Sequence, residues 1–362
     1  MKELLEICTA LQQLGDQPCA LATVINVEGS AYRRPGARML LTLEGGSWGM
    51  VSGGCLESDV MDHARRALQS GQPRIVRYDS TSDDDIVFGT GLGCNGIIDV
   101  FIEPVTKEFK ESFVCAVQTC HMTRQRGGVA TLVGNREQPN RFSEHAFLAA
   151  GRWVGSGALA TVLNIHAVEP GQTSLTSDYG GAPVFIQQLL PPVHVVIFGG
   201  WLDVLPLIHM SKEVGFHVTV VDPRQRLSSR RLFREADAVF LCSPEYALSQ
   251  IQVDDRTVAV VMNHHFERDQ ETLSALSHLS LNYIGTLGPK RRRERMLNGL
   301  KEAGVFISDD FVQTLHGPAG LDIGAKAPEE IALSIMAEIL SVLNGRDARP
   351  IRERQTALAT SA

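Results

Sequence analysis

The chain has 362 residues, of which 44% are hydrophobic and 21% are charged, and its formal net charge is −7. This length exceeds one ordinary hydrophobic core, so at least two domains are expected. The negative charge argues against general nucleic-acid binding, and no apolar run is long enough to cross a membrane. Seven cysteines without disulfide-like or zinc-like spacing indicate a protein of the reducing cytoplasm.

The first 104 residues predict one helix followed by a strand-rich region. Residues 1–16 lack the small-residue cleavage site of a signal peptide, and Leu4, Cys8 and Leu11 fall on one helical face. Strands are expected at 19–26, 38–43, 48–51, 74–78 and 97–103, with a second helix at 56–69.

A glycine-rich loop with a cysteine precedes this second helix. It consists of Ser52, Gly53, Gly54 and Cys55, and is called the SGGC loop below. Glycines let the backbone approach a ligand closely. The helix start and the nearby Arg33 and Arg34 favour the thiolate form of Cys55, so an accessible and reactive sulfur is expected.

A second loop of this kind lies at residues 88–96, where Gly91 and Gly93 precede Cys94. Close approach to a ligand explains its four glycines. The alternative for both cysteines is a small, buried, hydrophobic side chain. The other cysteines lie in apolar runs and are interpreted as core residues: Cys8, Cys19, Cys115, Cys120 and Cys242.

The region after Pro104 contains strand-like runs at 115–120, 128–134 and 182–190, joined by polar loops. We interpret residues 1–190 as one α/β domain, with a possible sub-domain after Pro104. Pro191 and Pro192 are interpreted as the linker to a second domain.

The second part of the chain alternates apolar strands with helices. Strands are expected at 194–198, 217–221, 237–241, 257–262 and 281–284, and helices at 201–214, 268–279, 289–303 and 328–343. Continuous apolar strands indicate a parallel sheet covered on both faces. The fold class is therefore α/β, with a doubly wound, Rossmann-like domain at 193–344 and a disordered polar tail at 345–362.

The first strand of this domain leads into a degenerate dinucleotide fingerprint. Gly199 occupies its expected position, and Asp222 ends the second strand, where a ribose-binding acid belongs. Trp201 replaces the glycine that lets the backbone approach a pyrophosphate, so NAD and NADP are expected to bind weakly or not at all. The alternative is that Asp222 only ends a strand.

A further glycine loop leads into a basic helix. Gly285 and Gly288 precede Lys290 and Arg291, which predicts an anion site at the helix start. The alternative is a solvated basic helix face. The adjacent histidines at 264 and 265 are interpreted as structural, because neighbouring strand residues point to opposite faces.

Several stretches together resemble the XdhC/CoxI family, the xanthine dehydrogenase accessory factors. They are EGSAYRRPGARMLL, VSGGCLES, GLGCNGIIDVFIEP, VVMNHHFERD, YIGTLGPKRRRERM and GLDIGAKAPEEIALSI, at 28–41, 51–58, 91–104, 260–269, 283–296 and 320–335. Cys55 and Cys94 match the family's SGGC and GLGC cysteines. The sequence at Trp201 departs from the more Rossmann-like glycine loop of many members.

The resemblance implies a molybdenum-cofactor chaperone rather than an enzyme. Family members bind the molybdopterin cofactor, protect it while a cysteine desulfurase-type partner supports its sulfuration, and insert it into an apo-molybdenum hydroxylase; a homodimer is expected. The implied cofactor-binding residues are Arg33, Arg34, Ser52, Gly53, Gly54, Cys55, Gly91, Gly93, Cys94, Gly199, Asp222, Gly285, Gly288, Lys290 and Arg291. Cys55 is also the candidate metal ligand, and Cys55 and Cys94 are expected to face a crevice at the carboxyl ends of the parallel strands.

Two alternatives remain open from the sequence. An NAD(P)-dependent oxidoreductase would use the Rossmann-like domain for hydride transfer, against which Trp201 counts. A non-catalytic interaction protein would use the same domain only as a dimer scaffold.

Overall fold

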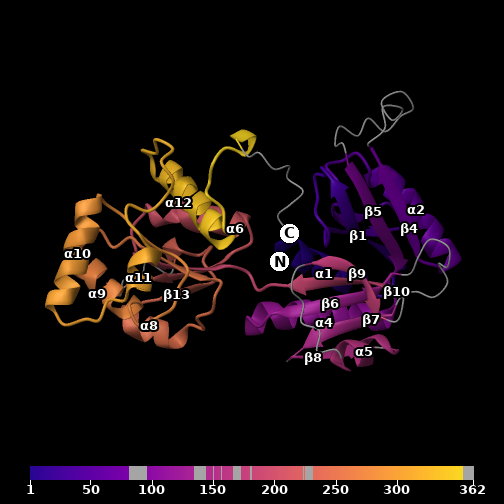
Figure 1. The fold of residues 1–362 in the computed structure, drawn as a ribbon, viewed down its shortest axis with the longest axis horizontal. Coiled ribbons are helices and arrows are strands. Elements are labelled where there is room, and N and C mark those ends of the chain that lie inside the picture. Colours follow the sequence, from indigo (N-terminus) through magenta and orange to yellow (C-terminus); the bar gives the residue numbers. More distant parts are fainter. Residues whose placement is uncertain are drawn as a thin grey trace. The chain divides into compact units, whose positions relative to one another are not determined.

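The computed structural model describes residues 1–80, 96–133, 144–149, 151–155, 157–165, 173–179, 182–222, 224 and 231–353. The chain forms two compact units, Met1–Pro191 and Pro192–Glu353, which are the indigo-to-magenta and the later-coloured parts of Figure 1. Each unit has its own sheets and its own hydrophobic clusters.

The first unit contains, in its described residues, two antiparallel sheets of five strands each. The first sheet has the order β3 (Ser47–Gly49), β2 (Arg38–Thr42), β1 (Cys19–Gly29), β5 (Gly96–Pro104) and β4 (Arg74–Asp79). The second has the order β8 (Arg152–Gly155), β7 (His145–Ala149), β6 (Gly127–Leu132), β10 (Ala182–Leu189) and β9 (Ser174–Tyr179). Its helices are α1 (Lys2–Gln13), α2 (Glu57–Ser70), α4 (Lys107–Thr123) and α5 (Leu159–Ile165).

Strand β1 builds two hydrophobic layers because its side chains alternate between the faces of the sheet. Ala20 and Ala22 pack with α2 on one face. Leu21 packs on the other face with residues of α1 and α4, in a cluster that includes Val129 and Leu189 of the second sheet. Helices α1 and α4 therefore connect the hydrophobic cores of the two sheets.

The prediction of a strand at 115–120 is wrong, since these residues belong to helix α4. The helix begins where the Thr106 side chain accepts a hydrogen bond from the backbone N–H of Phe109. Phe109, Phe113, Val117 and Cys120 are buried and recur at helical spacing. The strand prediction used only the six residues 115–120, whereas the helical spacing of buried residues extends over the whole of α4.

The second unit contains a sheet whose described strands are all parallel, as predicted. Its order is β13 (Ala238–Phe240), β12 (His217–Val221), β11 (His194–Phe198), β14 (Thr257–Val261), β15 (Ile284–Thr286) and β16 (Leu315–His316). The chain order reverses between β11 and β14, which is the switch point where ligands bind in open α/β sheets.

Helices cover both faces of this sheet. Val195 and Ile197 pack on one face, in a cluster with α6 (Val204–Glu213) and α12 (Pro328–Leu343). Val196 and Phe198 pack on the other, in a cluster with α8 (Pro244–Gln250), α9 (Phe266–Leu276), α10 (Lys290–Glu302) and α11 (Asp309–Thr314). Burial on both faces explains why the strands are continuously apolar.

Some boundaries of the second unit differ from the prediction. Helix α12 begins and ends where expected, but β15 lies at Ile284–Thr286 rather than at 281–284. The short β16 was not among the expected strands, because its two residues form a strand only by pairing with β15. After α12 the chain ends, in its described part, with a 3-10 turn at Ile351–Glu353, and residues 354–362 of the predicted tail lie outside the described residues.

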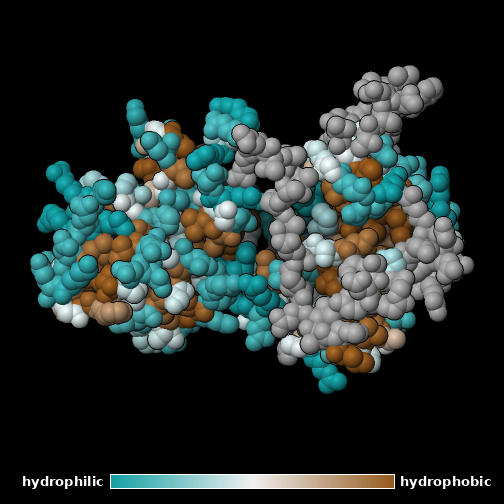
Figure 2. Space-filling model, in the orientation of Figure 1, coloured by the Kyte–Doolittle hydropathy of each residue, from teal (hydrophilic) through white to brown (hydrophobic). Residues whose placement is uncertain are grey.

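Hydrophilic and hydrophobic residues are interspersed on the face shown in Figure 2. None of the helices in the described ranges combines the length and the apolar character of a membrane span.

Candidate functional site

Hydrogen bonds clamp the SGGC loop to the start of α2. The buried Ser52 accepts hydrogen bonds at its Oγ from the backbone N–H groups of Leu56 (3.0 Å) and Gly54 (3.2 Å). The Ser52 hydroxyl donates to the Glu57 carboxylate, which also accepts from the Ser52 backbone N–H at 2.8 Å. These bonds satisfy backbone donors that a helix start leaves unpaired.

The clamp also keeps Glu57 ionised. Partial burial works to raise the pKa of Glu57, but hydrogen bonds from the side chain and backbone of Ser52 outweigh it. The pKa of Glu57 therefore lies below its ordinary value. A carboxylate in the first turn of a helix also interacts favourably with the helix dipole.

Cys55 is exposed at the end of this clamped loop. Gly54 has φ +112°, and within the described part of the chain no atom lies within 4 Å of the position that a Cβ there would take. The described residues therefore leave space beside the cysteine. By contrast, burial raises the pKa of the Cys8 thiol to about 12, although the charge of Arg38 opposes this.

The interpretation of the remaining cysteines as core is confirmed for Cys8, Cys19 and Cys120, which are buried. It is wrong for Cys115, which is exposed on α4 because it follows the buried Val114 onto the solvent side of the helix. Cys242 is half-buried.

Strand pairing brings Ser80 and Gly96, which flank the interval that contains the second glycine–cysteine loop, to one end of the first sheet. Gly96 of β5 pairs with Gly29 of β1. Its carbonyl accepts from the Ser80 backbone N–H at 3.0 Å, and its N–H donates to Ser80 Oγ at 3.1 Å. We call these bonds the Ser80–Gly96 clasp. Gly91, Gly93 and Cys94 lie outside the described residues.

Gly96 is required at this position by close packing. A Cβ there would lie 2.2 Å from the backbone oxygen of Ser30. On the neighbouring strand β4, the Tyr78 hydroxyl donates to Asp59 of α2 at 2.7 Å. The clasp, residue 30 and the start of α2 therefore lie at the same end of the first sheet as the SGGC loop.

The predicted arginine pair has one member held by helix α1. Arg33 forms an ion pair with Glu3, whose other carboxylate oxygen accepts from the Met50 backbone N–H at 3.2 Å. This arrangement ties the loop before β2 to α1. Arg34 is exposed.

The degenerate fingerprint of the second unit is filled by the protein's own side chains. Asp222 is fully buried and accepts from the backbone N–H of Arg224 at 3.1 Å and from its Nε at 2.9 Å. The Arg224 guanidinium lies 4.4 Å from the centre of the Trp201 ring and also donates to the Gly200 carbonyl. The carboxylate expected to bind ribose is therefore paired within the chain.

The start of α6 also carries an acidic group. His264 follows β14 with φ +56°, and its Nε2 lies 2.6 Å from Oδ2 of Asp203, the residue before α6. A pyrophosphate at this helix start would meet the carboxylate. The structural interpretation of His264 agrees with this bridge between two loops.

The basic run at the start of α10 divides into two pairs. Arg292 forms an ion pair with Asp269 at 2.7 Å, and Arg293 donates to the Val312 carbonyl at 2.9 Å. Lys290 and Arg291 are exposed and form no ion pair with the described residues. These two cations are the ones available to an anion.

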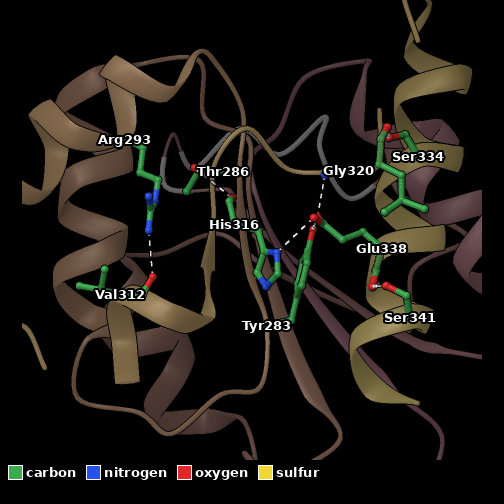
Figure 3. Close-up of polar contacts among 10 residues, drawn as sticks. Tyr283, Thr286, Arg293, Val312, His316, Gly320, Ser334, Glu338 and Ser341 are labelled. Atoms are coloured by element: carbon green, nitrogen blue, oxygen red, sulfur yellow. Dashed lines mark hydrogen bonds and ion pairs between the residues drawn. The ribbon is translucent and has the colours of Figure 1, made fainter. Parts of the chain in front are cut away.

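A half-buried polar cluster fixes the loop after β16, and Figure 3 shows it. Glu338 of α12 accepts from the Tyr283 hydroxyl and from the Gly320 N–H, both at 2.7 Å, and lies 3.1 Å from Nδ1 of His316. The rings of Tyr283 and His316 stack with centres 4.6 Å apart. Sequence reasoning missed this cluster, because its members are up to 55 residues apart.

Among the described residues, no three side chains of His, Cys, Asp or Glu converge to hold a metal ion.

Comparisons with known proteins cover most of the chain. The model of the XdhC and CoxI family matches residues 13–79, and that of the XdhC Rossmann domain matches residues 195–339. The chain is 34% identical to a probable xanthine dehydrogenase subunit of Bacillus subtilis, over 90% of this chain and 93% of that protein. It is 25% identical to the molybdenum cofactor insertion chaperone PaoD of Escherichia coli, over 89% and 82%.

A solved structure has the same fold. The crystal structure of a xanthine dehydrogenase from Bacillus halodurans superposes with a TM-score of 0.79 and is 32% identical, covering 96% of this chain and 97% of that one.

Proposed function

Because the chain belongs to the XdhC and CoxI family, we propose that it binds the molybdenum cofactor as cargo and delivers it to an apo-molybdenum hydroxylase such as xanthine dehydrogenase. The observation that carries this proposal is the exposed Cys55 on a hydrogen-bonded glycine loop, beside the anchors of the second glycine–cysteine loop. The similarity to a chain named as a cofactor insertion chaperone supports it.

The available side chains fit the chemistry of this cargo. Dithiolene-bound molybdenum is a soft centre, and the Cys55 sulfur is a soft donor. The cofactor also carries a phosphate or a dinucleotide, for which Lys290 and Arg291 at a helix start are suited. Gly285 and Gly288 keep the backbone before that helix closely packed, since a Cβ at either would meet Tyr283, Ala319 or Arg292 within 3.0 Å.

In this proposal the chain is an accessory protein of the cytoplasm and not a catalyst. It protects the cofactor while a cysteine desulfurase-type partner installs the terminal sulfido ligand, and it acts as a homodimer.

The test is purification from a host that makes molybdopterin, followed by measurement of molybdenum and pterin per chain. The cofactor-loaded protein is then mixed with an apo-hydroxylase. We expect bound pterin and activation of the hydroxylase, and neither from a host that cannot make molybdopterin. A chain without pterin from the competent host would contradict the proposal.

The alternative as an NAD(P)-dependent oxidoreductase is disfavoured by the pairing of Asp222 with Arg224. Calorimetric titration with NAD and NADP distinguishes the two. A micromolar dissociation constant would support the oxidoreductase, whereas we expect no binding in that range.

A further inference from the structure

Tyr32 presents an aromatic ring to solvent beside the SGGC loop. Its exposed fraction is 67%, although burial of a tyrosine ring normally stabilises a fold. Tyr32 belongs to none of the hydrophobic clusters formed by the described residues. Stability of the fold therefore does not explain an aromatic side chain at this position.

The ring lies flat on the loop. A Cβ built on Gly53 would lie 3.5, 3.6 and 3.7 Å from Cγ, Cδ1 and Cδ2 of Tyr32. Three nearly equal distances place that position over the face of the ring rather than beside its edge. One face of the ring is therefore turned toward Gly53, two residues before the exposed Cys55.

The support is rigid, because the hydrogen bonds of Ser52 and Glu57 hold the loop beneath the ring. The phenolic oxygen makes no hydrogen bond to the rest of the described chain, so the ring and not the hydroxyl is the distinctive group. Because 67% of the Tyr32 surface is exposed, part of the ring is accessible to a flat ligand.

We propose that Tyr32 is a stacking platform for the pterin ring of the cofactor, which places the cofactor's sulfur and molybdenum end toward Cys55. This inference rests on the proposed function. A pterin is flat and conjugated, and such rings stack on tyrosine at about 3.5 Å with favourable dispersion and electrostatic contacts.

The test compares three variants purified from the molybdopterin-producing host. Tyr32→Ala removes the ring, and Tyr32→Phe keeps the ring without its hydroxyl. Tyr246→Ala is the matched control, since Tyr246 is also exposed, at 59%, but lies on α8 of the other unit. The measurements are melting temperature, pterin bound per chain, and the rate of pterin release on dilution.

We expect Tyr32→Ala to keep its melting temperature and to release pterin roughly tenfold faster than the wild type. Tyr32→Phe and Tyr246→Ala should release it at the wild-type rate. If Tyr32→Ala released pterin at the wild-type rate, or if Tyr32→Phe released it as fast as Tyr32→Ala, the stacking role of Tyr32 would be contradicted. Either result would leave the proposed function intact. A wild-type chain without pterin would overturn the proposed function and this inference with it.

Discussion

Ser52 is the residue through which the SGGC loop acquires a defined shape. Its backbone N–H, its hydroxyl proton and its hydroxyl lone pairs are all used, in bonds to Glu57, Gly54 and Leu56. A loop with two glycines would otherwise lose much conformational entropy on ordering. The exposed Cys55 is thus presented by a loop that is already ordered before any ligand binds, which lowers the cost of binding.

Replacement of Cys55 by serine tests whether its sulfur is the working group. Because Cys55 is exposed, Cys55→Ser should shift the melting temperature by no more than about 1 °C. The soft donor is lost, so we expect several-fold less bound molybdenum cofactor and poor activation of a client hydroxylase. Pterin and molybdenum analysis of the purified variant measures this loss.

Cys115→Ser is the matched control, since Cys115 is also exposed but lies on α4, and Cys242→Ser is a second control. Both should keep full cofactor content, and Cys94→Ser is expected to lose less cofactor than Cys55→Ser. Full cofactor content in Cys55→Ser would end the idea that this sulfur holds the cargo.

At the scale of elements, helix α12 does more than cover the parallel sheet. Through Glu338 it holds Tyr283 before β15, His316 of β16 and the loop at Gly320. Burial works to raise the pKa of Glu338, but hydrogen bonds from His316, Gly320 and Tyr283 outweigh it and lower the pKa. Ionised Glu338 therefore stabilises the folded state.

The lowered pKa sets the pH dependence of this contribution. It is fully present above the pKa of the unfolded carboxyl, about 4.3, and is lost as pH falls through the lower folded pKa. Glu338→Gln should reduce the free energy of unfolding by about 2 kcal/mol at pH 7. The difference from wild type should shrink below about pH 4.

Urea unfolding of both proteins at several pH values measures this difference. Glu329→Gln is the control, because Glu329 is an exposed residue of the same helix. A Glu338→Gln variant as stable as wild type at pH 7 would show that the cluster contributes nothing net.

The elements predicted best are those decided by local pattern. Strands β11, β12 and β14 are buried on both faces, and their continuous apolar sequences predicted both their positions and their parallel pairing. Helix α12 was bounded correctly by Pro328. The prediction of a strand at 115–120 was wrong because it considered these six residues alone. The buried phenylalanines that precede them in α4 complete a helical pattern.

At the scale of the whole molecule, the candidate groups are divided between the two units. Cys55 belongs to the first, and Lys290 and Arg291 belong to the second. Lys290 and Arg291 are proposed to hold the phosphate of the cofactor, so removing their two charges should weaken cofactor binding roughly tenfold, and the loss should depend on salt. The double variant Lys290→Gln and Arg291→Gln tests this by pterin release at two salt concentrations.

The control removes equal charge at Arg346 and Arg349, which are exposed after α12. If both double variants weakened cofactor binding equally, Lys290 and Arg291 would contribute only through the overall charge of the protein and not through a specific anion site. The expectation that the cysteines face the carboxyl ends of the parallel strands stays a prediction.

The sequence predicted the candidate site only in part. The exposure of Cys55 followed from its glycines, because small neighbours leave a sulfur uncovered. The orientation of Tyr32 over Gly53 and the pairing of Asp222 with Arg224 were not predicted. Both depend on how loop backbones fold in three dimensions, which neither periodicity nor composition records.

The Ser80–Gly96 clasp has a consequence for how relatives of this protein diverge. The clasp and the pairings of β5 with β1 and β4 join the described residues on either side of the interval 81–95. A chain in which this interval is exchanged for that of a relative should melt at the wild-type temperature, and a large drop would contradict this. The paired strands on either side of this interval would then serve as a common frame on which relatives carry different loops.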